Sequence, residues 1–122
     1  MHRRSTGKED RARMPRRGMM DKIAGLREIL LIDDKNSFAR YGLAMEFAGQ
    51  GQTDAALVEF DILLHNDPGY TAGYFMAAQT LANAGRTPEA IARLRAGIRS
   101  AQASGNHHAL SEMQTMLDEL DR

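Results

Sequence analysis

Apolar residues recur every three or four positions through most of the chain after residue 19. This spacing is typical of one face of an α-helix and differs from the alternation of a strand. In residues 37–66 the apolar positions are Leu43, Ala44, Phe47, Ala56, Leu57, Phe60, Leu63 and Leu64. The pattern predicts an all-α chain with helices over residues 20–33, 37–50, 53–66, 71–84, 87–103 and 107–121.

The chain also resembles itself at an offset of 34 residues, as expected for a repeat protein. Small residues match small ones and large apolar residues match large ones: Gly51 with Gly85, Ala56 with Ala90, Phe47 with Leu81, Phe60 with Leu94, and Tyr41 with Phe75. We therefore expect two repeats, residues 37–70 and 71–104. Residues 19–36 correspond to the second half of an earlier repeat.

Each repeat is expected to fold as helix, tight turn, helix. Glycines near residues 49–51 can adopt the positive φ with which a helix often ends. Thr53 and Thr87 are predicted N-caps of the second helices, and Pro88 follows at the first helical position. The small residues that should lie where two helices approach closely are Ala44, Ala56, Ala78 and Ala90.

With this period, turn glycine, paired alanines and the terminator Asp67-Pro68, residues 37–104 resemble two tandem tetratricopeptide repeats. The resemblance implies an α–α superhelix of antiparallel helix pairs that mediates protein–protein contacts. Two residues depart from the family pattern. Arg40 lies where the family usually has a large aromatic, and Leu63 where it usually has a small residue.

Residues 107–121 are predicted to form a helix that caps the array. Their apolar residues form one stripe and the polar residues lie on the other side, which suits the end of a solenoid. Asn106 is its predicted N-cap. The stripe contains Ala109, Leu110, Met113, Met116, Leu117 and Leu120.

The resemblance implies that the first helix of each repeat lines a concave groove. Aromatic rings and thioethers there would provide contact area, and amides would satisfy a peptide backbone. The expected partner-binding residues are Phe38, Tyr41, Met45, Phe75, Gln79 and Asn83. The alternative is that the terminal helices cover these rings. Family members that clamp a terminal carboxylate use Lys and Asn on these faces, so Tyr41 and Met45 argue against such a clamp.

The N-terminal helix carries more apolar residues than one stripe needs. The stripe Met20, Ile23, Leu26 and Leu30 is extended by Ile29, Leu31 and Ile32. The charged sequence before Met19 offers no preceding helix to cover this surface, and a two-fold dimer is the commonest way to bury such a face. We expect a homodimer through residues 19–32, or a heterotypic partner on the same surface.

Composition narrows the function further. There is no Cys, so disulfides and thiolate metal sites are excluded, and no run is apolar enough for a membrane span or a signal peptide. A cytoplasmic protein is therefore expected. Residues 1–18 contain seven Lys or Arg against two Asp or Glu, whereas the rest has nine against fourteen. This basic tail is predicted to be disordered.

Three interpretations of the tail remain open. It could contact nucleic acid or another anionic surface, or fold back on the acidic body. It could also be a solvated segment upstream of the true initiating methionine, such as Met14 or Met19. Nucleic acid is not the expected partner of the body.

The sequence gives little support for a catalytic or metal-binding site. Gly7-Lys8 lacks the earlier glycine and the strand of a phosphate loop, and adjacent His107 and His108 diverge by about 100° on a helix with no third ligand nearby. We expect no enzyme activity, no cofactor and no metal. The partner should be a protein or peptide.

Overall fold

The computed structural model describes residues 21–122, and these residues are largely helical with no strand. An N-terminal helix covers residues 21–32. It is followed by α2 (Ser37–Gly49), α3 (Thr53–Asn66), α4 (Thr71–Asn83), α5 (Thr87–Ser104) and α6 (His107–Leu120). The predicted all-α fold with six helices is confirmed, with bounds within about two residues of those expected. The prediction for residues 1–18 lies outside the described part of the chain.

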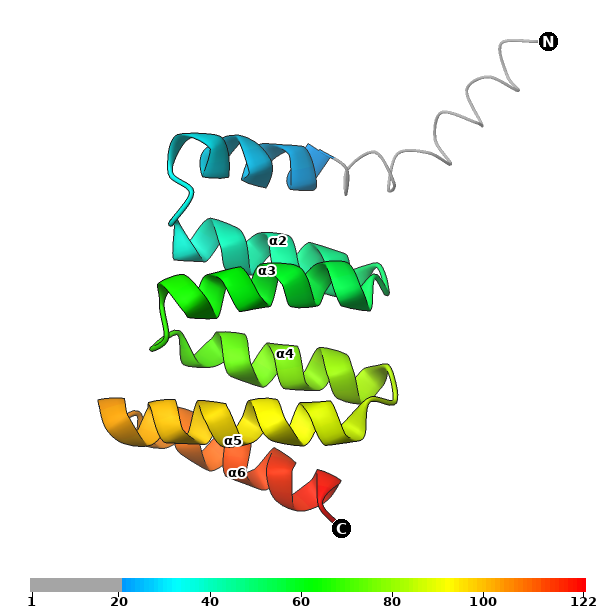
Figure 1. Cartoon of the computed structure of the whole chain (residues 1–122), viewed down its shortest axis with the longest axis vertical. Coiled ribbons are helices and arrows are strands. Elements are labelled where there is room, and N and C mark those ends of the chain that lie inside the picture. The colour runs from blue at the N-terminus through cyan, green and yellow to red at the C-terminus, as the bar shows by residue number, and fades with distance from the viewer. Residues whose placement is uncertain (1–20) are drawn as a thin grey trace, which may run out of the picture.

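The helices stack in chain order along one long axis, each running back against the one before it (Figure 1). The most extensive packing is within the pairs α2–α3 and α4–α5, and α6 packs on α5. Helix α4 also touches α2 and α6, which places these three helices on one side of the stack. This is the antiparallel arrangement of an α–α superhelix.

The two turns inside the repeats have the same backbone hydrogen bonds. Gly51 has φ of 75° and Gly85 has φ of 77°. Glycine adopts this positive-φ conformation at little steric cost because it has no Cβ. The next N–H then reaches back five residues: that of Gln52 to the carbonyl of Phe47 and that of Arg86 to the carbonyl of Leu81, both at 2.9 Å. The 34-residue period of the sequence is therefore also a period of the main chain.

These turns correct the predicted caps. Thr53 and Thr87 are the first residues of α3 and α5, and the capping positions are Gln52 and Arg86, which make no side-chain cap bond. The reason is the turn itself, because a glycine with positive φ followed by one non-helical residue already completes the connection. The predicted cap of α6 is confirmed, since the Asn106 side chain accepts from the Ala109 N–H at 3.1 Å.

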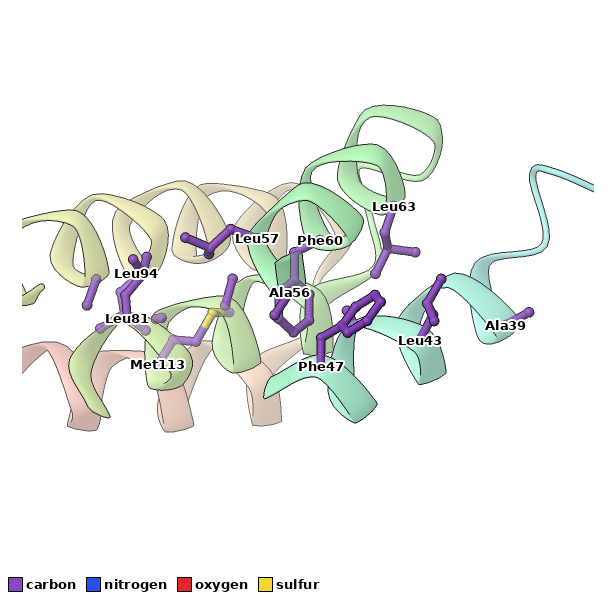
Figure 2. Packing of buried hydrophobic residues seen from close by; sticks show 14 of the residues in the cluster. Ala39, Leu43, Phe47, Ala56, Leu57, Phe60, Leu63, Leu81, Leu94 and Met113 are labelled. Carbon is purple, nitrogen blue, oxygen red and sulfur yellow. The ribbon is translucent and has the colours of Figure 1, made fainter. Parts of the chain in front are cut away.

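The core consists of the small and large residues that the repeat pattern selects. The four alanines at the expected close contacts, together with Phe60 and Leu94, are fully buried. Figure 2 shows Phe47 and Phe60 side by side near Ala56, with Leu81, Leu94 and Met113 further along the same core. Close helix approach at alanine leaves room for a large side chain beside it, which is the packing rule that the sequence follows.

The two departures from the family pattern are each compensated. Arg40 is largely buried, and its guanidinium donates to the Glu59 carboxylate at 2.9 Å and to the Asp34 carbonyl at 2.9 Å. Leu63 is buried against Gly73, where an added Cβ would lie 3.1 Å from the Leu63 side chain. A charge pair replaces an aromatic in one case, and a glycine accommodates a larger residue in the other.

The N-terminal helix directs its stripe inward, toward its own chain. Leu30 is only 8% exposed, and Ile23 and Leu26 pack against the core, with Leu26 over Gly42 of α2. Leu30 is thus covered by its own chain, whereas Ile23 and Leu26 are half-buried, and dimerisation through this stripe stays a prediction. Met20 lies outside the described residues. The apolar residues of this helix that are exposed are Ile29, Leu31 and Ile32.

Candidate functional site

Helices α2, α4 and α6 share one side of the stack, and a row of hollows runs along it. One hollow of about 320 Å³ lies between the N-terminal helix and α2, and one of about 610 Å³ lies between the C-terminal halves of α2 and α4. Two more, of about 280 Å³ and 460 Å³, lie between α4 and α6. Neighbouring hollows share lining side chains, so we treat them together as the α2–α4–α6 groove.

The six residues predicted from the sequence all line this groove. Phe38, Tyr41 and Met45 line the hollow beside the N-terminal helix. Gln79 and Asn83 line the hollow between α2 and α4, and Phe75 lies between the two hollows at α6. The structure thus brings them to one face; that they bind a partner stays a prediction.

Tyr41 connects the groove to the core. Its ring lies 5.3 Å from that of Tyr70 and 6.4 Å from that of Phe60, the latter edge-on, a favourable geometry for aromatic pairs. Burial, and next the nearby Tyr70, raise the pKa of Tyr41 above its ordinary value. Its position is therefore fixed, and removing its ring would affect the fold as well as the groove.

Other groove residues extend further into solvent. Phe38 is 78% exposed, Gln79 and Asn83 are exposed, and Met45 and Phe75 are half-buried. The terminal helices form walls beside these residues: Lys22 and Leu26 on one side, and residues of α6 on the other. The expected alternative, in which the terminal helices cover the rings, therefore applies in part to Met45 and Phe75 and not to Phe38.

A contribution from α6 to this groove was not predicted from the sequence. Polar residues expected on the solvated side of the capping helix line the hollows over α4, together with Met76 of α4 and Met116 of the apolar stripe. The polar α6 residues are His108, Ser111, Glu112, Thr115 and Glu119. Their three- and four-residue spacing could have indicated a second face, but only the packing of α6 beside α4 turns that face into a groove wall.

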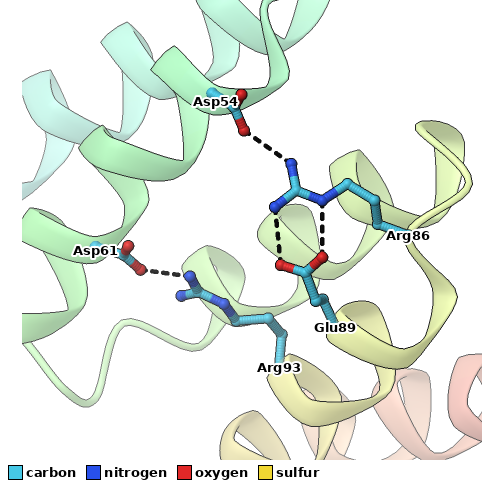
Figure 3. Close-up of polar contacts among 5 residues, drawn as sticks. All are labelled: Asp54, Asp61, Arg86, Glu89 and Arg93. Atoms are coloured by element: carbon cyan, nitrogen blue, oxygen red, sulfur yellow. Dashed lines mark hydrogen bonds and ion pairs between the residues drawn. The ribbon is translucent and has the colours of Figure 1, made fainter.

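The outer face of the stack carries a network of charges that neutralise one another (Figure 3). Arg86, the residue before α5, makes two hydrogen bonds of 2.8 Å to Glu89 and one of 2.8 Å to Asp54 of α3. Its guanidinium lowers the pKa of Glu89, chiefly through these hydrogen bonds. Arg93 pairs in the same way with Asp61 of α3. Arg86 and Arg93 are thus directed toward α3.

Comparison with known proteins agrees with this geometry. The family model of the tetratricopeptide repeat matches residues 47–113, more than half of the chain. The chain belongs to the tetratricopeptide repeat family. Tetratricopeptide repeat proteins are modules of protein–protein interaction, which is the general function that this membership supports.

Relatives of similar size share this fold. The TPR repeat-containing protein PA0015 of Pseudomonas aeruginosa is 28% identical over 100 residues, which are 82% of this chain and 95% of that one. The solution structure of protein BPP2914 from Bordetella parapertussis superposes with a TM-score of 0.71 at 28% identity and covers 82% of this chain and 87% of that one.

A more distant neighbour shows the fold alone. The Yersinia enterocolitica type III secretion chaperone SycD, in complex with a peptide of the translocator YopD, superposes with a TM-score of 0.75 at 20% identity. The match covers 90% of this chain and 85% of that one.

Between residues 21 and 122, no three His, Cys, Asp or Glu side chains gather in a way that could hold a metal ion. Within the same range, no helix has the length and apolar character needed to cross a membrane.

Proposed function

We propose that this protein binds a segment of a partner protein in the α2–α4–α6 groove, without catalysing a reaction. The observation that carries the proposal is the row of hollows in which exposed or half-exposed apolar side chains lie beside exposed amides. Apolar side chains of an extended or helical segment would contact Phe38, Met45 and Phe75. The amides of Gln79 and Asn83 would satisfy its backbone groups.

The rigidity of the groove supports this proposal. Tyr41 is fixed by Tyr70 and Phe60, and Phe75 lies on a helix that packs on both neighbours. A preformed surface loses little side-chain entropy on binding, which favours affinity. The chaperone SycD has the same fold and was solved with a peptide of its translocator, so this architecture can accommodate a peptide.

A selection from an unbiased library of displayed peptides, followed by affinity measurements on the selected peptides, tests the proposal. Phe38→Ala combined with Phe75→Ala should weaken binding at least about tenfold, because a few aromatic anchors usually supply most of the energy of an interface. Phe38 is a better probe than Tyr41, since its exposed ring contributes little to folding. The matched control is Val58→Ala with Arg99→Ala, two exposed residues of the outer helices.

Amide chemical shifts recorded with a selected peptide supply a second reading. We expect the largest changes on α2, α4 and the facing side of α6. Shift changes confined to α3 and the outer side of α5 would show that the peptide binds outside the groove. An equal loss of affinity in the control variant would show the same.

A second candidate function is self-association through the N-terminal helix. The observation that favours it is the exposure of Leu31 and Ile32, 86% and 90%, beside Ile29 at 44%. Exposed apolar residues that are adjacent in space often mark a contact site. This surface is the extension of the stripe, within the residues 19–32 expected from the sequence, and a homodimer through it would leave the groove available.

A further inference from the structure

Charge is distributed unevenly along the α2–α4–α6 groove. At the end beside the N-terminal helix, Lys22 lies 3.9 Å from Glu46, so the two charges there offset each other. At the end between α4 and α6, Glu112 and Glu119 line the hollow, and no Lys or Arg among residues 21–122 lines it with them. The groove is therefore nearly neutral at one end and acidic at the other.

The acidic end is also apolar at its centre. Glu112 and Glu119 are seven residues apart on α6, so they lie on one face about 10 Å apart along the helix axis. Met116 lies between them on the same helix, and Phe75 of α4 faces the same hollow. An apolar surface between two carboxylates fits a ligand with an apolar side chain flanked by two cations.

The arginines of α5 do not neutralise this end. Arg86 and Arg93 bond to carboxylates of α3 on the outer face, and Arg95 lies 3.8 Å from Asp121 at the end of α6. The Glu112 carboxylate lies 3.5 Å from the Nε2 of His108 on the same helix. Its side chain is 53% exposed and accessible to a ligand.

We infer that the partner segment is basic where it contacts α6: a large apolar residue seated on Phe75 and Met116, flanked by Lys or Arg that pair with Glu112 and Glu119. In an extended segment every second side chain faces the same way, so the apolar residue should have a basic residue two positions before it and another two positions after it. The two basic residues are then about 13 Å apart along the segment, and their long side chains can reach carboxylates about 10 Å apart. This inference rests on the groove being the binding site, and it adds the chemistry of the ligand.

The peptide selection proposed for the groove also tests the inference of a basic partner segment, if the charged residues of the selected peptides are counted. Wild-type protein should enrich sequences in which Lys or Arg flank an aromatic or aliphatic residue. Binding of these peptides should weaken as salt is added, since exposed ion pairs are screened. Glu112→Gln and Glu119→Gln should each weaken binding about two- to fivefold, which is the usual size of an exposed ion pair.

Charge reversal gives the sharpest comparison. Glu112→Lys with Glu119→Lys should remove the enrichment of basic residues and select acidic ones, while Phe75→Ala still weakens binding. Asp118→Asn is the matched control, because it removes one negative charge from the same helix at a residue outside the hollow. Its affinity for the selected peptides should equal that of wild type.

The outcomes separate this inference from the proposed function. Peptides that bind in the groove without preference for basic residues overturn the inference of a basic partner. The groove then remains the proposed binding site. Peptides that ignore Phe38 and Phe75 overturn both. If only a chain starting at Met19 selects peptides, the chain's own basic residues 1–18 occupy the acidic end, which overturns the inference of a separate basic partner.

Discussion

The guanidinium of Arg40 donates to the carboxylate of Glu59 at 2.9 Å, and both side chains are about 85% buried. The pair joins the first helix of a repeat to the second helix of the same repeat, at the position where tetratricopeptide repeats usually have an aromatic ring. Within the described residues the Nε of Arg40 has no hydrogen-bond partner. A buried ion pair of this kind stabilises only as long as both partners are present.

Loss of one partner should therefore cost more than loss of both. Glu59→Met leaves the guanidinium buried without its carboxylate, and we expect the free energy of unfolding to fall by about 3 kcal/mol. Arg40→Met with Glu59→Met should recover most of that loss. Urea denaturation of the two single variants and the double variant measures the coupling, and additive losses would show that the pair is not a unit.

Gly97 of α5 should tolerate no larger side chain. An added Cβ would lie 2.5 Å from the sulfur of Met113 in α6 and 2.6 Å from the Cβ of Tyr74 in α4, so the three helices would have to separate. Gly97→Ala should lower the free energy of unfolding by about 1–3 kcal/mol.

The matched control for this variant is Gly25→Ala. Gly25 also lies within a helix, with no atom within 4 Å of its added Cβ. It should raise stability by about 0.4–1 kcal/mol, since alanine restricts the unfolded chain and favours helix. Thermal melts of the two variants should shift in opposite directions, and equal shifts would contradict the close packing of α5 with α4 and α6.

The periodicity of the chain predicted the fold well because packing positions repeat every 34 residues, and Ala44, Ala56, Ala78 and Ala90 are all fully buried. The predicted N-caps were displaced by one residue, since Thr53 and Thr87 are the first residues of α3 and α5. The turn closes through backbone bonds to Phe47 and Leu81, and no side-chain pattern records these bonds.

The ends of the array were harder to predict than its middle, because periodicity identifies an apolar stripe but not which neighbour covers it. Leu30 was expected to be open and is covered by its own chain, and Glu112 was expected to face solvent and lines a hollow. The six groove residues could be found because they lie inside the complete repeats.

Stability should fall in alkaline solution, where Tyr41 and Tyr70 ionise. Burial raises the pKa of Tyr41 and of Tyr70 above the ordinary value of 10.0, with a further contribution from Tyr70 in the first case and from Asp67 in the second. The folded chain therefore holds these protons more tightly than the unfolded chain. The resulting stabilisation is complete below pH 10 and is lost as the pH rises through the folded pKa values.

Denaturation measured at several pH values from 9 upward tests this. Tyr41→Phe with Tyr70→Phe should flatten the decline, because phenylalanine keeps the ring and cannot ionise. A decline as steep in this variant as in wild type would assign the effect to other groups. Absorbance titration of the phenolate gives an independent check, and a bound groove peptide should raise the pKa of Tyr41 further by excluding water.

The exposed residues Leu31 and Ile32 should mediate self-association, so we expect a homodimer in solution. Leu31→Glu with Ile32→Glu should yield a monomer and leave the melting temperature of the monomer nearly unchanged, since both side chains already lie in solvent. Leu26→Glu is the informative contrast: its side chain packs against the core and over Gly42, so it should destabilise the fold itself.

Light scattering after size exclusion separates these effects, with circular dichroism to report folding. A wild-type protein that stays monomeric at high concentration rules out the dimer. A dimer that persists in the Leu31→Glu, Ile32→Glu variant places the contact elsewhere, and Phe38, another strongly exposed apolar residue, is then the next residue to change. Because Phe38 also lines the groove, dimerisation through it would compete with peptide binding, and the selected peptides would dissociate the dimer.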